Sequence, residues 1–365
     1  MVSEKWRQLS LGEVATLQRG YDLPHKERKP GTVPIISSSG SIDTHNESRV
    51  AGPGVVTGRY GTIGQVFFVT EDFWPLNTTL FVKDFKGNDP LFISFLLRTI
   101  DYHSYSGKSG VPGVNRNDLH EIALSLPSLP EQRAIAATLS DVDALIMSLD
   151  RLIAKKRDIK QATMQQLLTG KTRLPGFNEK WEVKKLGEIT EVVMGQSPVG
   201  TSYNRDGNGY PLINGPTEFT DRYPIKIQWT NEPTKFCKKK DILVCVRGSS
   251  TGRINIANDD YCIGRGIAAI RAKAEVNTEY ITFQVDWAVK NILALTTGST
   301  FPNIDGKSIR SIECPLPNFS EQQAIANILS DMDAEIAALE QKRDKTRSLK
   351  QGMMQELLTG KTRLV

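Results

Sequence analysis

Two segments of the chain carry apolar residues at the spacing of a coiled coil. Steps of four and three residues alternate, which is the 3.5-residue seam that lets one long helix pack against another. We therefore expect a long helix in residues 126–174 and a second in residues 316–365. The seam consists of Ile135, Leu139, Val142, Ile146, Leu149 and Ile153 in the first segment, and of Ile325, Leu329, Met332, Ile336 and Leu339 in the second.

The ends of both segments fit helix boundaries. Ser320 with Gln323 has the pattern of a capping box, and Pro130 suits a first turn. Gly170 and Gly360 suit C-terminal caps. Each helix of about 38 residues would be about 57 Å long. Because a globular unit separates them, the helices have room to pair antiparallel and hold the flanking units apart. A plain dimerisation helix stays an open alternative.

The two helical segments are copies of each other. Residues 126–174 and 316–364 are identical at about 28 of 49 aligned positions without a gap, which indicates a duplication. The regions before them match more loosely: Trp6 and Trp181 are each followed at the same spacing by Leu-Gly-Glu. The predicted organisation is a first variable unit (1–125), a helix (126–174), a second variable unit (175–315) and a final helix (316–365).

Both variable units read as short strands joined by glycine-rich turns, with turn 58–64 in the first and turn 247–253 in the second. Loops 109–115 and 299–305 occupy equivalent places near the ends of the units. Such turns bring arginines and backbone amides close to a phosphate or a base edge, although similar hairpins without a ligand are common. Together with the long helices, these strands predict a mixed α/β (α+β) fold.

Composition narrows the class of protein only slightly. The 365 residues are 39% hydrophobic and 24% charged, as in a typical globular protein, and the net charge of +5 is a weak indication of an acidic partner. No apolar run could span a bilayer and the N-terminal residues lack a secretory pattern, so we expect a cytoplasmic protein. Free buried thiols are expected for Cys237, Cys245, Cys262 and Cys314, with no metal site.

Reactive motifs of an enzyme were not found. The Gly-Lys-Thr runs at Gly170 and Gly360 lack the first glycine of a phosphate loop and end a helix, where the dipole repels phosphate. Gly264 to Ala269 fits a dinucleotide fingerprint loosely, but strands surround it. All four histidines lie in the first unit. We therefore expect no catalytic residues and no cofactor bound by this chain.

Taken together, these motifs resemble the specificity subunit of a type I restriction-modification enzyme. The resemblance covers essentially the whole chain. It is carried by the openings at Trp6 and Trp181, the Gly195-Gln196-Ser197-Pro198 run, the Leu-Pro-x3-Glu-Gln-x-Ala-Ile-Ala helix starts at Leu126 and Leu316, and both Leu-Leu-Thr-Gly-Lys ends.

The resemblance implies two tandem target-recognition domains, each followed by a long helix, with the helices pairing as an antiparallel coiled coil of pseudo-twofold symmetry. Each domain would read one half of a bipartite, asymmetric DNA target, while the helices set the spacer and dock two methyltransferase subunits. Restriction subunits would complete the complex. S-adenosylmethionine, ATP and Mg²⁺ are expected in the partner subunits. Two alternatives remain: a related system with a fused methyltransferase-nuclease partner, and a coiled-coil scaffold that never binds DNA.

Contacts to DNA are expected from polar and basic side chains in the turns and unit openings, since arginine and amide side chains position the duplex and discriminate bases. Gly20-Tyr21-Asp22-Leu23 replaces the Gly-Gln-Ser-Pro run in the first unit, so the two units should read different sequences. The predicted contacts are Arg19, Tyr21, Arg59, Tyr60, Thr62, Lys108 and Asn115 in the first unit, and Ser197, Tyr203, Asn204, Arg205, Arg247, Ser249, Ser250, Arg253, Thr300 and Asn303 in the second.

Overall fold

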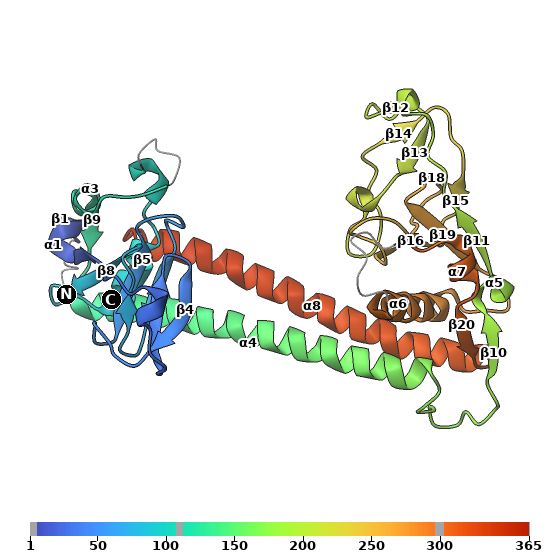
Figure 1. The fold of residues 1–365 in the computed structure, drawn as a ribbon, viewed down its shortest axis with the longest axis horizontal. Helices are drawn as coiled ribbons and strands as arrows, with labels where there is room; N and C mark the ends of the chain where they lie inside the picture. Colours follow the sequence, from blue (N-terminus) through green and yellow to red (C-terminus); the bar gives the residue numbers. More distant parts are fainter. Residues whose placement is uncertain (1–5, 107–111, 296–302, 365) are drawn as a thin grey trace. The chain divides into compact units, whose positions relative to one another are not determined.

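The structure, a computed structural model, describes residues 6–106, 112–295 and 303–364. The chain divides into two compact units. Unit 1 comprises residues Met1–Arg151 and Glu340–Val365, and unit 2 comprises Leu152–Leu339. Each unit combines short strands, short helices and parts of both long helices (Figure 1). The predicted mixed α/β class is therefore confirmed, whereas the boundaries proposed between variable units and helices stay predictions.

Unit 1 is built on a four-stranded antiparallel sheet of order β2-β8-β5-β6. A three-stranded sheet, β4-β3-β7, and the pair β1-β9 complete its strands. The elements are β1 Arg7–Ser10, α1 Leu11–Val14, β2 Thr16–Arg19, β3 Val33–Ser37, β4 Gly40–His45, β5 Gly54–Gly58, β6 Val66–Val69, β7 Trp74–Pro75, β8 Thr79–Asp84, α2 Pro90–Leu97, α3 Arg116–His120 and β9 Ala123–Leu126, with 3-10 helices at His25–Glu27 and Tyr102–Tyr105.

Unit 2 repeats the four-stranded sheet in the order β11-β19-β16-β17 and adds a five-stranded sheet, β12-β14-β13-β18-β15. The predicted strand-turn-strand arrangement is confirmed in both units. The elements are β10 Glu182–Lys185, α5 Leu186–Ile189, β11 Thr190–Met194, β12 Tyr203–Asn204, β13 Tyr210–Ile213, β14 Trp229–Thr230, β15 Phe236–Cys237, β16 Ile242–Cys245, β17 Ile254–Ile256, β18 Tyr261–Ile263, β19 Ile267–Ala272, α6 Thr278–Leu295, α7 Gly306–Arg310 and β20 Glu313–Leu316, with 3-10 helices at Gly200–Ser202 and Pro216–Glu218.

The long helices are α4, Leu129–Leu168, and α8, Phe319–Leu357. Gly170 and Gly360 follow them with φ of 69° and 73°, the left-handed conformation expected of C-terminal caps. The predicted capping box at Ser320 is wrong, because Ser320 already lies inside α8. Asn318 caps the helix instead: its side-chain oxygen accepts a hydrogen bond from the Glu321 backbone N–H at 2.8 Å.

Some predicted seam positions belong to the cores of the globular units. Ile135 and Leu139 pack with the unit 1 sheet and with Leu357, the last residue of α8, and Leu358, which follows it. Ile325 and Leu329 pack likewise with the unit 2 sheet, as do Met164, Leu167 and Leu168 at the end of α4. Of the remaining seam positions, Leu149, Ile153 and Ile336 are buried, and Val142, Ile146, Met332 and Leu339 are partly buried.

Ion pairs link the two long helices within each unit. In unit 1, Lys350 contacts Asp143 at 2.6 Å and Arg347 contacts Asp150 at 2.9 Å. In unit 2, Lys156 contacts Glu335 at 2.6 Å and Lys160 contacts Asp333 at 2.5 Å. In both units the partner's residue number on α8 falls as the residue number on α4 rises, so the paired helix segments run antiparallel.

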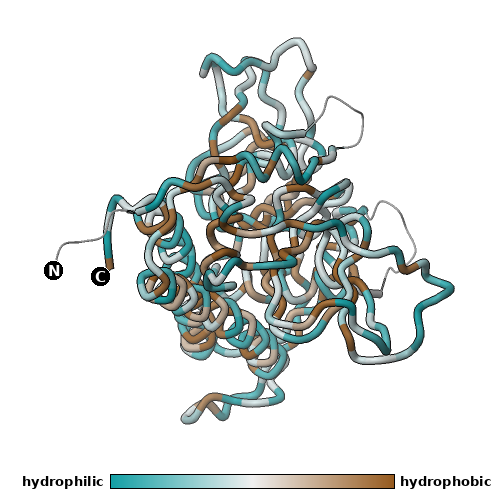
Figure 2. The backbone as a smooth tube through the Cα atoms, turned by 90° about the vertical axis from the view of Figure 1, so that its left-hand side faces the viewer, coloured by the Kyte–Doolittle hydropathy of each residue, from teal (hydrophilic) through white to brown (hydrophobic). Residues whose placement is uncertain are grey.

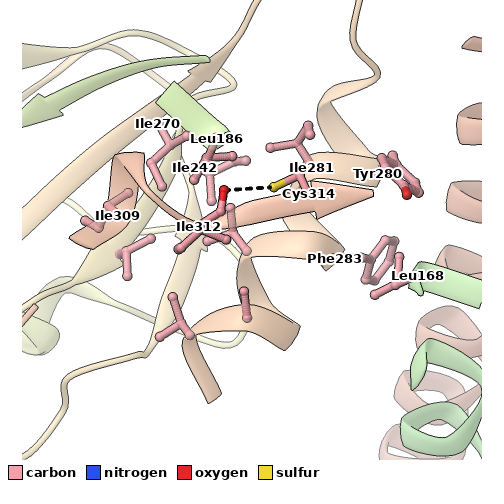
Figure 3. Packing of buried hydrophobic residues seen from close by; sticks show 14 of the residues in the cluster. Leu168, Leu186, Ile242, Ile270, Tyr280, Ile281, Phe283, Ile309, Ile312 and Cys314 are labelled. Carbon is pink, nitrogen blue, oxygen red and sulfur yellow. Dashed lines mark hydrogen bonds between the residues drawn. The ribbon is translucent and has the colours of Figure 1, made fainter. Parts of the chain in front are cut away.

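The buried residues of both units are mainly hydrophobic, and the outer loops are mainly hydrophilic (Figure 2). Figure 3 shows part of the unit 2 core, in which Ile242 and Ile270 of the sheet lie close to Ile312, and the Cys314 thiol points to the Ile312 carbonyl. All four cysteines are free and buried, as predicted. Among the described residues, no helix has the length and apolar character needed to cross a membrane, and no group of metal-binding side chains occurs.

Candidate nucleic-acid interface

The turn after β5 is held in place by backbone hydrogen bonds. The N–H groups of Arg59 and Tyr60 donate to the Thr78 carbonyl at 2.8 and 3.1 Å, and Val114 N–H donates to the Arg59 carbonyl at 3.0 Å. The turn then reverses through Gly61, whose φ of 79° is readily adopted only by glycine. The segment that leads into α3 is thereby fixed against the turn.

These elements surround a hollow of about 650 Å³. Four predicted contacts meet there: Arg19 from the end of β2, Arg59 and Tyr60 from the turn, and Asn115 from the α3 cap. The Arg59 guanidinium lies over the Tyr60 ring, 4.9 Å from its centroid. The described residues that line it are Arg19, Arg59, Tyr60, Leu80, Gly113, Val114, Asn115 and Arg116. We call this feature the arginine hollow.

Arg116 was missed by the sequence prediction. It is the first residue of α3 and directly follows Asn115, whose side-chain oxygen accepts from Asn117 N–H at 3.0 Å and caps the helix. Its position next to a predicted contact was the only available signal. Within the described parts of the chain, none of the arginines of the hollow has a carboxylate within salt-bridge distance. The hollow is therefore an uncompensated region of positive charge.

His120, at the end of α3, is partly buried and lies close enough to Arg116 for that charge also to lower its pKa. Its Nε2 accepts a hydrogen bond from Leu17 N–H at 2.9 Å, so the ring is neutral in this arrangement. Burial and the nearby charge of Arg116 lower the pKa of His120, and Glu121 opposes this effect. The α3 helix is thus tied to β2, the strand that carries Arg19.

Tyr21 and Thr62, the other described candidates of unit 1, do not line the hollow. The Tyr21 ring packs against Trp74 and Phe81 at centroid distances of 6.5 and 5.8 Å, so it belongs largely to the interior. Thr62 is exposed in the turn. Lys108, and Thr300 in the second unit, lie outside the described residues.

The equivalent turn of unit 2 has the same backbone frame. Ile304 N–H donates to the Val246 carbonyl at 3.0 Å, and Arg247 forms a bridge with Asn303, as Tyr60 does with Gly113. Arg247 and Asn303, both exposed, are therefore brought together as predicted.

The remaining residues of that turn have different environments. Ser249 is exposed and Ser250 is partly buried. The exposed Arg253 directs its guanidinium toward the carbonyls of Pro216 and Phe219 at 3.5 and 3.4 Å. These long contacts leave its charge available at the surface.

Several predicted contacts of unit 2 hold their own loops. Ser197 donates to the Asn214 side chain at 3.1 Å and accepts from Arg265 N–H at 3.1 Å. The Tyr203 hydroxyl donates to the Pro198 carbonyl at 3.2 Å. Asn204 accepts from the N–H groups of residues 206 and 208 and so stabilises a turn. Arg205 is exposed in that turn.

The repeated motifs also form a cluster of the same kind in each unit, which the sequence did not predict. Glu131, fully buried, accepts from Trp6 Nε1 at 3.2 Å and from Arg363 at 2.5 and 2.7 Å. In unit 2, buried Glu321 accepts from Trp181 Nε1 at 2.9 Å and twice from Arg173 at 2.7 Å. We call these arrangements the Trp–Glu–Arg clusters. The Gly-Lys-Thr-Arg runs therefore position an arginine beside a buried carboxylate.

Comparison with known proteins identifies the family of these repeated units. A family model described as "Type I restriction modification DNA specificity domain" matches residues 3–156 and again residues 178–346. A putative type I restriction enzyme MjaX specificity subunit from Methanocaldococcus jannaschii is 34% identical over 293 residues, which are 76% of this chain and 69% of that protein. The type I restriction enzyme MjaVIII specificity subunit of the same organism is 24% identical over 306 residues, 75% of this chain and 70% of its own length.

Solved structures share the fold. A chain from a study of complex assembly and conformational transition in a type I restriction-modification system has a TM-score of 0.66 at 23% identity, covering 99% of this chain and 100% of that one. The type I system S subunit from M. genitalium has a TM-score of 0.65 at 17% identity, covering 98% and 96%. At these identities the likeness concerns the fold alone.

Proposed function

Because this chain belongs to the type I restriction-modification DNA specificity family, we propose that each of its two units reads a different half of one bipartite DNA target. The chain is a specificity subunit with two DNA-recognition domains. Its two units share a four-stranded sheet and a turn backbone, yet they present different side chains at equivalent places. That combination is the observation that carries the proposal: a common frame with different reading surfaces fits an asymmetric target.

Contacts in the turns both position the DNA backbone and read its bases in this proposal. Arg59, Tyr60 and Asn115 would contact DNA from unit 1, and Arg247, Arg253 and Asn303 from unit 2. Arginine suits both phosphates and guanine edges, and asparagine suits adenine edges. The exposure of Tyr60 and Arg247 supports this assignment.

The two long helices act as a spacer and as a docking platform. We propose that α4 and α8 pair as an antiparallel coiled coil with pseudo-twofold symmetry, and the ion pairs between them within each unit support this pairing. Apolar side chains remain exposed along both helices, namely Leu145, Met147, Leu152, Ile159 and Leu349. Such residues would pack against two methyltransferase subunits, and restriction subunits would then join that complex. S-adenosylmethionine, ATP and Mg²⁺ would be bound by those partners.

A binding experiment with divided targets tests the reading function. Sequencing of the methylated genome first identifies the target site. The chain, purified with its methyltransferase partner, is then mixed with a duplex that contains this site. We expect tight binding of the intact duplex, and loss of specific binding when either half-site is scrambled. A scaffold that never reads DNA would bind all duplexes equally weakly. The family match does not favour that alternative or a fused methyltransferase-nuclease partner.

A paired insertion tests the spacer function. Seven residues are inserted after Arg151 in α4 and seven after Leu339 in α8, which preserves the 3.5-residue seam and lengthens each helix by about 10 Å. We expect the recognised spacer to grow by roughly three base pairs while both half-sites stay the same. Sequencing of methylated sites measures both properties. Altered half-sites with an unchanged spacer would contradict this role of the helices.

A further inference from the structure

The arginine hollow is lined by three arginines from three separate elements. Arg19 ends β2, Arg59 begins the turn after β5, and Arg116 begins α3. Each element is fixed: Gly20 N–H donates to the Thr79 carbonyl at 3.1 Å directly after Arg19, and the Arg59 carbonyl accepts from Val114. The backbone that carries these charges is therefore set before any ligand arrives.

The chemistry of the hollow fits a polyanion better than a base edge. A guanidinium presents five donors and no acceptor, and one bidentate arginine already satisfies the acceptor edge of a guanine. Three arginines without carboxylate partners match several phosphate oxygens, which guanidinium groups bind bidentately. Successive phosphates of a DNA strand supply such an array of acceptors.

Unit 2 lacks all three charges at the equivalent positions. Met194 corresponds to Arg19, because the following Gly195 N–H donates to the Ile267 carbonyl as Gly20 does to Thr79. Val246 corresponds to Arg59, since its carbonyl accepts from Ile304. Gly306 begins α7 as Arg116 begins α3.

Among the described residues of unit 2, Arg310 brings one guanidinium to this frame, beside Gly306 and Met194, where unit 1 has three arginines. Val246 is fully buried, and the neighbouring Arg247 stands where unit 1 has Tyr60. The two units therefore differ in the residue types at these three positions.

We propose that the arginine hollow binds the DNA phosphate backbone at the first half-site and gives unit 1 the larger salt-dependent share of binding. This inference rests on the proposed reading function and assigns a ligand class, a phosphodiester strand, to the hollow. Unit 2 has fewer arginines at this frame and then makes fewer phosphate contacts there. The two half-sites should consequently tolerate added salt to different extents.

The test removes the three charges together and measures the salt dependence of duplex binding. The variant Arg19→Gln/Arg59→Gln/Arg116→Gln is assembled with the methyltransferase partner. Each phosphate contact contributes about 0.9 to the slope of log affinity against log salt, so we expect the slope to fall by about 2.7. Between about 50 and about 200 mM salt, the wild-type complex should lose about 40-fold more affinity than the variant. The methylated consensus should stay unchanged.

A matched control removes the same net charge from unit 1 outside the hollow. Arg7, Lys26 and Lys83 are exposed and do not line it, so Arg7→Gln/Lys26→Gln/Lys83→Gln should leave the slope at the wild-type value. Each single arginine variant should lower the slope by about 0.9, which keeps the test valid if the triple variant folds poorly.

Three outcomes would overturn the inference: an unchanged slope in the triple variant, an equal fall in the control, or relaxed specificity at one base position, which would indicate base reading. Wild-type binding that is indifferent to sequence would instead contradict the proposed reading function. The two failures are thus distinguishable.

Discussion

Units 1 and 2 differ at the arginine hollow and agree at the Trp–Glu–Arg clusters. Unit 1 places Arg19, Arg59 and Arg116 where unit 2 has uncharged residues, although the backbone hydrogen bonds around them correspond. By contrast, Glu131 and Glu321 are both fully buried and accept from the same kinds of donor. Packing and desolvation restrict which side chains can occupy a buried position, whereas a turn keeps its shape with many different side chains.

The helix starts extend this agreement beyond charge. The Gln132 side chain accepts from Asp89 N–H at 3.0 Å ahead of α2, and Gln322 accepts from Asn277 N–H at 2.9 Å ahead of α6. Each repeated Glu-Gln pair therefore joins a long helix to the globular part of its unit. Loss of these side chains would leave buried polar groups unpaired, which costs more than the hydrogen bond itself contributes.

The largest expected effect is equal destabilisation of both units by core truncation. Leu139→Ala in unit 1 and Leu329→Ala in unit 2 each remove a fully buried side chain at the same place in the repeat. Each should lower the free energy of unfolding of its own unit by about 3 kcal/mol. Denaturant-dependent hydrogen exchange resolves the two units. Leu145→Ala, at an exposed site on α4, is the control. A cost below about 1 kcal/mol in one unit would break the equivalence.

A smaller but again equal effect is expected from the Trp–Glu–Arg clusters. Glu131→Gln and Glu321→Gln keep the side-chain size and remove the buried charge that the arginine and tryptophan donors contact. Each should cost about 2 kcal/mol, because hydrogen bonds to charged groups are lost. The exposed Glu47→Gln serves as the control for loss of a carboxylate. Thermal unfolding measures all three variants. Stability unchanged by either buried substitution would show that its cluster contributes little.

The smallest effect is the dependence on pH that His120 gives to the stability of unit 1. The pKa of His120 is lowered from its ordinary value of 6.5, chiefly by burial and then by Arg116, so the unfolded chain binds its proton more readily than the folded chain. Stability is therefore lost as pH falls below about 6.5, and the loss levels off below the folded pKa. Unit 2 has Arg310 at this place, which donates to the Val192 carbonyl at 2.9 Å.

The variant His120→Gln isolates this contribution. The difference in unfolding midpoint between wild type and variant, measured at about pH 7.5 and about pH 5.5, should shift against the wild type at the lower pH. Arg310→Gln in unit 2 should show no such shift. A difference that is constant with pH would mean that the histidine does not titrate on unfolding in this range.

Sequence patterns located the long helices, their glycine caps and the paired turns. Alternating steps of three and four residues predicted α4 and α8 because helical periodicity is local, and Gly170 marked an end because its conformation is local too. The same reasoning brought Arg59, Tyr60 and Asn115 forward as candidates, and the fold gathers them in one hollow with Arg19.

Other assignments required the folded chain. Tyr21 and Ser197 look like exposed polar candidates in the sequence, but one packs inside unit 1 and the other holds a loop of unit 2. Ile135 and Ile325 lie on the seam, yet they complete globular cores. Periodicity reveals that a face is apolar and does not reveal which element covers it.

Sequence patterns were enough to identify the duplication, the two long helices and the two DNA-recognition units. Each of these depends on residue identity or on spacing within a short segment. The folded chain was needed to show that Arg363 contacts Glu131, that Arg116 and Arg19 line one hollow, and that unit 2 has uncharged residues at the equivalent positions. These pairings join residues far apart in the chain. Such contacts depend on strand order and on burial, which no local pattern of hydrophobic and polar positions specifies.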